Sequence, residues 1–126
     1  MTNVDAIIKR FEQAFMKLEE VINAPMNDIM RDAAIRRFKL TFDPSWKVVK
    51  ALLETKHGIS CNSPKDCFRE AYRQGLLSYD DAWIKLVDLR NETAHTYNEE
   101  TAERIYKELP NALRHFTVLL TAAKGK

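Results

Sequence analysis

The stretch that decides the fold is residues 35–53, IRRFKLTFDPSWKVVKALL. Apolar and aromatic side chains recur in it at helical spacing: Ile35, Phe38, Phe42, Trp46, Val49 and Leu53. Aromatic rings at successive four-residue steps are typical of a helix that packs into a core rather than of a base-stacking platform. Pro44 lies inside the pattern and cannot donate a backbone hydrogen bond, so we expect a kink or a break there.

Four further helices are predicted around this central one from their apolar repeats and end signals. Asp28 is expected to cap the central helix, and Ser63-Pro64 has the pattern of another helix start. The five predicted helices cover residues 3–23, 28–56, 63–75, 78 or 80 to 97, and 98 to about 123. The sequence therefore predicts an all-α fold, an antiparallel up-down bundle of four long helices plus one short helix, in a single domain over residues 1–126.

Composition excludes several classes of protein. The 126 residues include only 3 Gly and 4 Pro, which favours helices over tight turns. No apolar run is long enough to cross a bilayer and no secretion signal begins the chain, so we expect a cytoplasmic protein with no membrane contact. Cys61 and Cys67 have no zinc-binding spacing relative to the scattered histidines. We expect no metal, no cofactor and free thiols, with one disulfide as the alternative.

The net charge of +2 is too small to indicate nucleic-acid binding by itself. Its distribution is uneven, because basic residues gather in the central helix: Arg31, Arg36, Arg37, Lys39, Lys47 and Lys50. A solvated helix face is the simpler interpretation of this cluster. A surface for phosphate groups is the alternative.

The predicted fourth helix ends in residues 90–97, RNETAHTY, which combine cationic, titratable and aromatic side chains. Helical spacing draws two stripes along it. One stripe is assigned to the core and consists of Ala82, Leu86, Leu89 and Thr93. The other mixes apolar and polar groups and consists of Trp83, Val87, Arg90, Ala94 and Tyr97. Such a mixture is typical of a contact with another molecule, so we expect this stripe to lie at an interface.

Arg90 and His95 lie about 140° apart around one straight helix, so a single helix cannot aim both side chains at one point. A two-fold pairing of the helix with its copy can bring them together, which predicts a homodimer with a composite site. The alternative is that Arg90 pairs with Asp88, Glu92 or a neighbouring helix. In that case His95 satisfies carbonyls at the helix C-terminus.

At the same residues the sequence resembles a known family. Arg90-x4-His95-x-Tyr97, with the polar Asn91 after the arginine, is similar to the Arg-x4-His-x-Tyr motif of HEPN-domain proteins. Three further blocks resemble the nucleotidyltransferase substrate-binding branch of that family, and they lie within residues 37–47, 63–77 and 95–102. The pair Asp43-Pro44 departs from the unbroken helix that this branch would have there.

The resemblance implies a helical bundle that dimerises and works beside a small, separately encoded nucleotidyltransferase, as in a toxin–antitoxin pair. It implies a metal-independent endoribonuclease without a cofactor, acting on RNA, with Arg90, Asn91 and His95 as catalytic residues. It also implies that the cognate minimal nucleotidyltransferase, as antitoxin, transfers AMP onto Tyr97 and thereby silences the enzyme.

The chemistry of these residues fits that expectation. An imidazole titrates near neutral pH, so His95 can move protons, and the planar fork of Arg90 can hold two phosphate oxygens. Asn91 can orient the arginine or the phosphate. The alternative is a non-catalytic subunit that binds a nucleotide or the substrate of a two-component nucleotidyltransferase through the same residues. A purely structural helical dimer is the third possibility.

Overall fold

All regular structure in the described residues, 3–78, 81–94 and 98–125, is helical. The elements of this computed structural model are α1 (Asn3–Ile22), α2 (Asp28–His57), α3 (Pro64–Arg73), α4 (Ala82–Glu92) and α5 (Glu99–Lys124). The predicted all-α fold with five helices is confirmed. α4 is shorter at both ends than the sequence pattern indicates, because its 11 residues begin only at Ala82 and end at Glu92, before the predicted end at residue 97.

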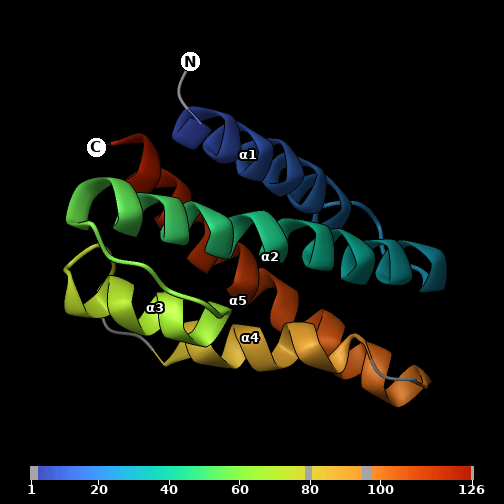
Figure 1. Cartoon of the computed structure of the whole chain (residues 1–126). Helices are drawn as coiled ribbons and strands as arrows, with labels where there is room; N and C mark the ends of the chain where they lie inside the picture. Colours follow the sequence, from blue (N-terminus) through green and yellow to red (C-terminus); the bar gives the residue numbers. More distant parts are fainter. Residues whose placement is uncertain (1–2, 79–80, 95–97, 126) are drawn as a thin grey trace.

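The longest helix, α2, lies at the centre of the molecule and packs against each of the other four helices. Figure 1 shows α1 along one side of α2, with α5 crossing both. The two short helices α3 and α4 lie side by side along the opposite side, and α4 also touches α5 (Figure 1). The motif helix α4 is therefore held between α3, α2 and α5.

A chain of aromatic rings connects all five helices through one core. Its members are Phe11 of α1, Phe116 of α5, Phe38 and Phe42 of α2, Phe68 of α3 and Trp83 of α4. Successive ring centroids lie between 4.8 and 6.3 Å apart, which is the range in which aromatic pairs attract each other. The core role predicted for the α2 aromatics holds for Phe38 and Phe42, whereas Trp46 is only partly buried.

Pro44 does not break α2, which runs without interruption through 30 residues. Hydroxyl groups next to the proline bond to the helix backbone: Thr41 donates to the carbonyl of Arg37 at 2.7 Å, and Ser45 to that of Phe42 at 2.6 Å. Leu40, whose carbonyl loses its helical donor to the proline ring, is 55% exposed, so water can reach this part of the helix.

Side-chain caps begin three of the helices. Asn27, Ser63 and Asn98 each accept a backbone N–H three residues further on, at 2.8, 3.3 and 2.9 Å. The cap of α2 is therefore Asn27 rather than the predicted Asp28, while the predicted start at Ser63 is confirmed. α2 ends at Gly58, which has a φ of 65°, a left-handed conformation that glycine adopts without steric cost.

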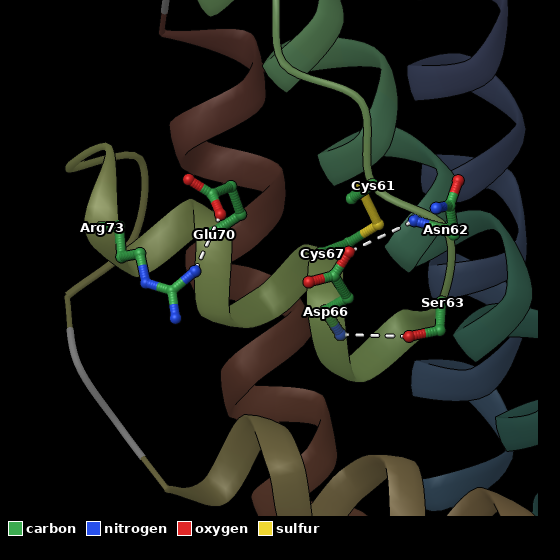
Figure 2. The surroundings of a disulfide bond; sticks show 7 residues. All are labelled: Cys61, Asn62, Ser63, Asp66, Cys67, Glu70 and Arg73. Atoms are coloured by element: carbon green, nitrogen blue, oxygen red, sulfur yellow. Dashed lines mark hydrogen bonds and ion pairs between the residues drawn. A yellow bond between two sulfur atoms is a disulfide. The ribbon is translucent and has the colours of Figure 1, made fainter.

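Cys61 and Cys67 form a disulfide, so the expectation of free thiols is wrong. The two Cα atoms lie 5.2 Å apart because the chain turns sharply into α3 between them. Figure 2 shows the Ser63 cap and the hydrogen bond from the N–H of Asn62 to Asp66, at 3.4 Å, that hold this turn. Both cysteines are buried, and the bond fastens the α2–α3 loop to the first turn of α3.

Candidate functional site

Arg90 lies in the last turn of α4 and reaches towards α2. Its side chain is 27% exposed, and its Nε lies 3.5 Å from Oδ1 of Asp43. The carbonyl of Arg90 accepts a hydrogen bond from the hydroxyl of Thr93 at 2.6 Å, which closes the end of the helix. A neighbouring helix thus holds the guanidinium at one edge, while part of the side chain stays exposed.

The acidic residues beside Arg90 on its own helix pair with other partners. Asp88 accepts from the Nζ of Lys65 in α3 at 2.8 Å, and Glu92 pairs with Arg104 in α5. The sequence offered Asp88, Glu92 or a neighbouring helix as partners of Arg90, and the structure shows the pairing with a neighbouring helix, through Asp43 of α2. The sequence alone did not single out Asp43 as its partner, because that residue lies far from Arg90 along the chain.

The two stripes of α4 have different surroundings from those predicted. Leu86, Leu89 and Thr93 of the core stripe are buried, as expected. Trp83 and Val87 are also buried, with exposures of 5% and 4%, and the Trp83 ring stacks on Phe68 at 4.8 Å. The predicted contact with a partner does not hold for Trp83 and Val87, because helices of the same chain cover them.

The other predicted site residues fall into two groups, those that the structure describes and those that it does not. Asn91 and Ala94 are exposed at the surface. His95 and Tyr97 lie outside the described residues, so their place relative to Arg90 stays a prediction. The described residues on either side of them, up to Ala94 and from Asn98 onward, define where this segment leaves α4 and enters α5.

A buried arginine fastens the beginning of α5 to the beginning of α2. Arg31 is 2% exposed and its two terminal nitrogens contact both carboxylate oxygens of Glu99 at 2.9 Å. Glu103 accepts from it at 3.0 Å and Asp32 at 3.3 Å. The hydrogen bonds that Arg31 donates to Glu99 and Glu103 raise its pKa, and Arg31 in turn lowers the pKa of Glu99.

A second ion pair fastens the end of α4. Arg104 of α5 pairs with Glu92, whose hydrogen bond and charge raise the pKa of Arg104. The end of α4 is therefore held through Glu92 and the beginning of α5 through Arg31. In the sequence, Arg31 is recognisable only as part of a basic cluster, because the carboxylates of Glu99 and Glu103 that surround it lie far along the chain.

Two findings limit the kinds of site that the described residues offer. Among them, no group of three or more His, Cys, Asp or Glu side chains is arranged to hold a metal ion. None of the helices in the same part of the chain is both long and apolar enough to span a membrane. Within the described residues, the candidate site consists of Arg90, its partner Asp43 and the two exposed residues Asn91 and Ala94.

A bundle of five helices with a part-exposed arginine near the end of the fourth, followed in sequence by His-x-Tyr, defines a HEPN-like helical protein. The sequence profile of proteins described as "nucleotidyltransferase substrate binding protein like" matches residues 6–124. The chain belongs to this family.

Relatives and solved structures agree with that membership. A Haemophilus influenzae protein named "probable ribonuclease HepT" is 31% identical over 99 residues, which cover 75% of this chain and 68% of the relative. A crystal structure of a Thermus thermophilus protein has a TM-score of 0.84 and 37% identity, covering 90% of this chain and 98% of the other. HI0074 of Haemophilus influenzae, described as having the fold of a substrate binding domain of a nucleotidyltransferase, has a TM-score of 0.69 and 27% identity, covering 96% of both chains.

Proposed function

We propose that this protein is the HEPN toxin of a toxin–antitoxin pair, a metal-independent endoribonuclease that a cognate minimal nucleotidyltransferase silences. The observation that carries the proposal is Arg90, held by Asp43 at 3.5 Å yet 27% exposed, at the start of the Arg-x4-His-x-Tyr sequence. The similarity to a protein named probable ribonuclease HepT supports the same activity.

Arg90 binds the phosphate at the bond to be cut. Its contact with Asp43 uses Nε, so the two terminal amino groups are the ones that meet phosphate oxygens. A guanidinium matches two oxygens of a phosphate in one plane, and the pair of hydrogen bonds is strengthened by the charges on both sides. The negative charge that develops on the phosphate during cleavage is stabilised by this contact. Asn91, exposed next to Arg90, orients the arginine or the phosphate.

His95 moves the protons. The 2′-hydroxyl of the RNA loses its proton to a base and attacks the neighbouring phosphorus, while the 5′-oxygen of the next nucleotide leaves and takes up a proton. The products are a 2′,3′-cyclic phosphate and a 5′-hydroxyl end, and no metal is needed for the proton balance. An imidazole can accept the first proton and return it to the leaving oxygen, since it titrates near neutral pH.

The proposed active form is a homodimer. α4 ends at Glu92, so helical spacing does not fix the angle between Arg90 and His95; the arginine of one protomer and the histidine of the other complete one site across a two-fold axis. Ala94 is exposed just beyond the end of α4 and is small, which permits a close approach of two protomers at this point. With Trp83 and Val87 in the core, the proposed interface is confined to the C-terminal end of α4 and the segment after it.

Silencing is proposed to occur through Tyr97. The partner nucleotidyltransferase transfers AMP onto the phenolic oxygen, which displaces pyrophosphate from ATP and releases the phenolic proton. The attached nucleotide places a negative charge close to Arg90 in sequence, where it competes with the phosphate of the RNA.

The alternative function is a non-catalytic subunit that binds a nucleotide or the substrate of a two-component nucleotidyltransferase. The description of the family and of HI0074 favours it. Both functions use Arg90, and they differ in whether an RNA bond is broken.

The deciding experiment is an RNA cleavage assay in EDTA with the wild type, His95→Ala and His57→Ala. His57 is an exposed histidine at the end of α2 and serves as the matched control. We expect cleavage by the wild type and by His57→Ala, and a rate about 10²–10⁴ lower for His95→Ala. Full activity of His95→Ala, or a strict need for Mg²⁺, contradicts the proposal, and nucleotide binding without cleavage supports the alternative.

A further inference from the structure

The basic residues between positions 31 and 50 of α2 divide into two groups in the structure. Arg31 is buried among carboxylates, and Arg37 donates to Glu20 and to the carbonyl of Lys17 in α1. The other four form no ion pair with any residue that the structure describes: Arg36, Lys39, Lys47 and Lys50. Lys50 lies over the ring of Trp46, with its Nζ 5.9 Å from the ring centroid, and all four side chains reach the surface.

These four residues share one face of α2, which we call the basic stripe. By helical geometry all four lie within about 40° of the direction of Asp43. Arg36 and Lys47 are exposed, and Lys39 and Lys50 are partly exposed. The stripe is about 21 Å long, from the 1.5 Å rise per residue. Asp32 and Glu54 lie on the same face beyond its ends, which confines the positive charge to this length.

Arg90 meets the basic stripe at its midpoint. Asp43 lies centrally between Arg36 and Lys50, and its carboxylate holds the Nε of Arg90. The negative charge of Asp43 is thereby matched, and the four basic residues leave an excess of positive charge on both sides of the guanidinium. A linear row of cations with a phosphate-binding arginine at its centre matches the charge pattern of a nucleic-acid strand, in which phosphates follow one another at short, regular distances.

We infer that the basic stripe is the track for the backbone of a single-stranded RNA, which passes over Asp43 so that the phosphate to be cleaved meets Arg90. Its length of about 21 Å spans several successive phosphates of a strand laid along the helix. This inference rests on the proposed ribonuclease function and assigns the residues that bind RNA on either side of the cleaved bond. Contacts of this kind hold the backbone without reading the bases.

The test compares two quadruple variants that change the net charge equally. The stripe variant is Arg36→Gln, Lys39→Gln, Lys47→Gln and Lys50→Gln. The control variant is Lys9→Gln, Arg10→Gln, Lys56→Gln and Lys107→Gln, all at exposed positions outside the stripe. Each variant lowers the formal net charge from +2 by four, to −2. The probe is a fluorescent single-stranded RNA that is 2′-O-methylated throughout, because it can bind but has no free 2′-hydroxyl to attack the phosphate.

The readout is the dissociation constant of the probe between about 50 and 200 mM salt. Each lost phosphate contact lowers the slope of log Kd against log salt concentration by about 0.7 for a single strand, so we expect the stripe variant to lose about three units of slope. The control variant is expected to keep the wild-type slope. With cleavable RNA, the stripe variant should show a raised KM and an unchanged kcat at saturating RNA, because the stripe does not touch the reacting atoms.

Equal salt slopes for the two variants overturn the inference. It is also overturned if the stripe variant binds the probe normally but no longer binds the nucleotidyltransferase, since the stripe is then a surface for an acidic protein. The proposed ribonuclease function can fail separately. If the wild type binds the probe through the stripe but cleaves no RNA, RNA binding by the stripe is retained and the ribonuclease function is refuted. Thermal melting of both variants checks that the fold is intact.

Discussion

Arg31 and Arg90 both carry a guanidinium from one helix to acidic side chains of another, yet they differ in how far their hydrogen-bonding capacity is used. Arg31 is 2% exposed and is surrounded by carboxylates of Glu99, Glu103 and Asp32. Arg90 has one carboxylate at 3.5 Å and keeps 27% of its side chain exposed. An arginine whose N–H groups are all bonded to carboxylates holds helices together. An arginine that contacts a carboxylate only through Nε has its other N–H donors left for a ligand.

The largest effect that tests this contrast is expected from Arg90→Ala. Loss of a donor that stabilises charge in the transition state typically lowers kcat by about 10²–10³, and the thermal midpoint should hardly change because the side chain is part-exposed. Single-turnover cleavage and thermal melting measure the two quantities. Arg10→Ala, at an exposed position of α1, is the matched control. If Arg90→Ala cleaves RNA at the wild-type rate, the proposed difference between Arg90 and Arg31 is wrong.

Arg31→Gln should show the opposite pattern. Its hydrogen bonds to Glu99 and Glu103 join the first turns of α2 and α5, and a glutamine side chain can replace only part of them. We expect the thermal midpoint to fall by several degrees, while kcat of the folded protein changes far less than in Arg90→Ala. Arg37→Gln, which removes a more exposed ion pair to Glu20, is the control and should be milder. An unchanged midpoint for Arg31→Gln would refute a structural role.

The pH dependence of stability sharpens the same comparison. Arg31 lowers the pKa of Glu99 in the folded protein, so folding is favoured above the ordinary carboxylate pKa of about 4.3. This contribution disappears as the pH falls through the lowered pKa and Glu99 becomes protonated. The difference in thermal midpoint between the wild type and Arg31→Gln should therefore be largest near neutral pH and shrink below about pH 4. A difference that is constant down to pH 3 would contradict this coupling.

The disulfide is expected to act on stability alone. It closes a loop with a sequence separation of 6 between Cys61 and Cys67, and chain entropy gives about 2 kcal/mol for so short a loop. Reduction should lower the unfolding free energy in urea by about that amount and leave cleavage unchanged. The double variant Cys61→Ser and Cys67→Ser is the control, because a reductant should have no effect on it. A change of kcat on reduction would show that this turn is coupled to the α4 site.

Sequence periodicity predicted the helices well, because it depends on local geometry. The position of Ser63 at the start of α3 follows from capping chemistry in the same way. The effect of Pro44 did not follow, because the carbonyl that loses its donor belongs to the exposed Leu40, where water can reach it, and the packing of a helix of 30 residues outweighs one lost hydrogen bond. The disulfide also did not follow, because the spacing of Cys61 and Cys67 in the sequence does not give the distance between their Cα atoms.

The candidate site could be predicted only as far as it lies on one helix. Helical spacing places Trp83 and Val87 in one stripe with Arg90. It cannot tell which residues of that stripe another helix of the same chain will cover. The pairing of Arg90 with Asp43 joins α4 to α2, and such a contact depends on how the helices pack. The same holds for the division of the α2 basic residues into neutralised and available ones, which required the positions of Glu20, Glu99 and Glu103.

The smallest expected effect comes from Asp43→Asn, and it changes two parameters in opposite directions. The amide keeps the size of the side chain but removes the charge that orients the Nε of Arg90, so kcat should fall by less than about tenfold. The same change removes a negative charge from the middle of the basic stripe, so RNA should bind more tightly and KM should fall. Steady-state cleavage at two salt concentrations measures both parameters.

Asp88→Asn, whose partner is Lys65 rather than Arg90, is the matched control. A fall in kcat as large as that of Arg90→Ala would mean that Asp43 takes part in proton transfer, whereas no change in either parameter would mean that the ion pair with Arg90 has no role in RNA cleavage.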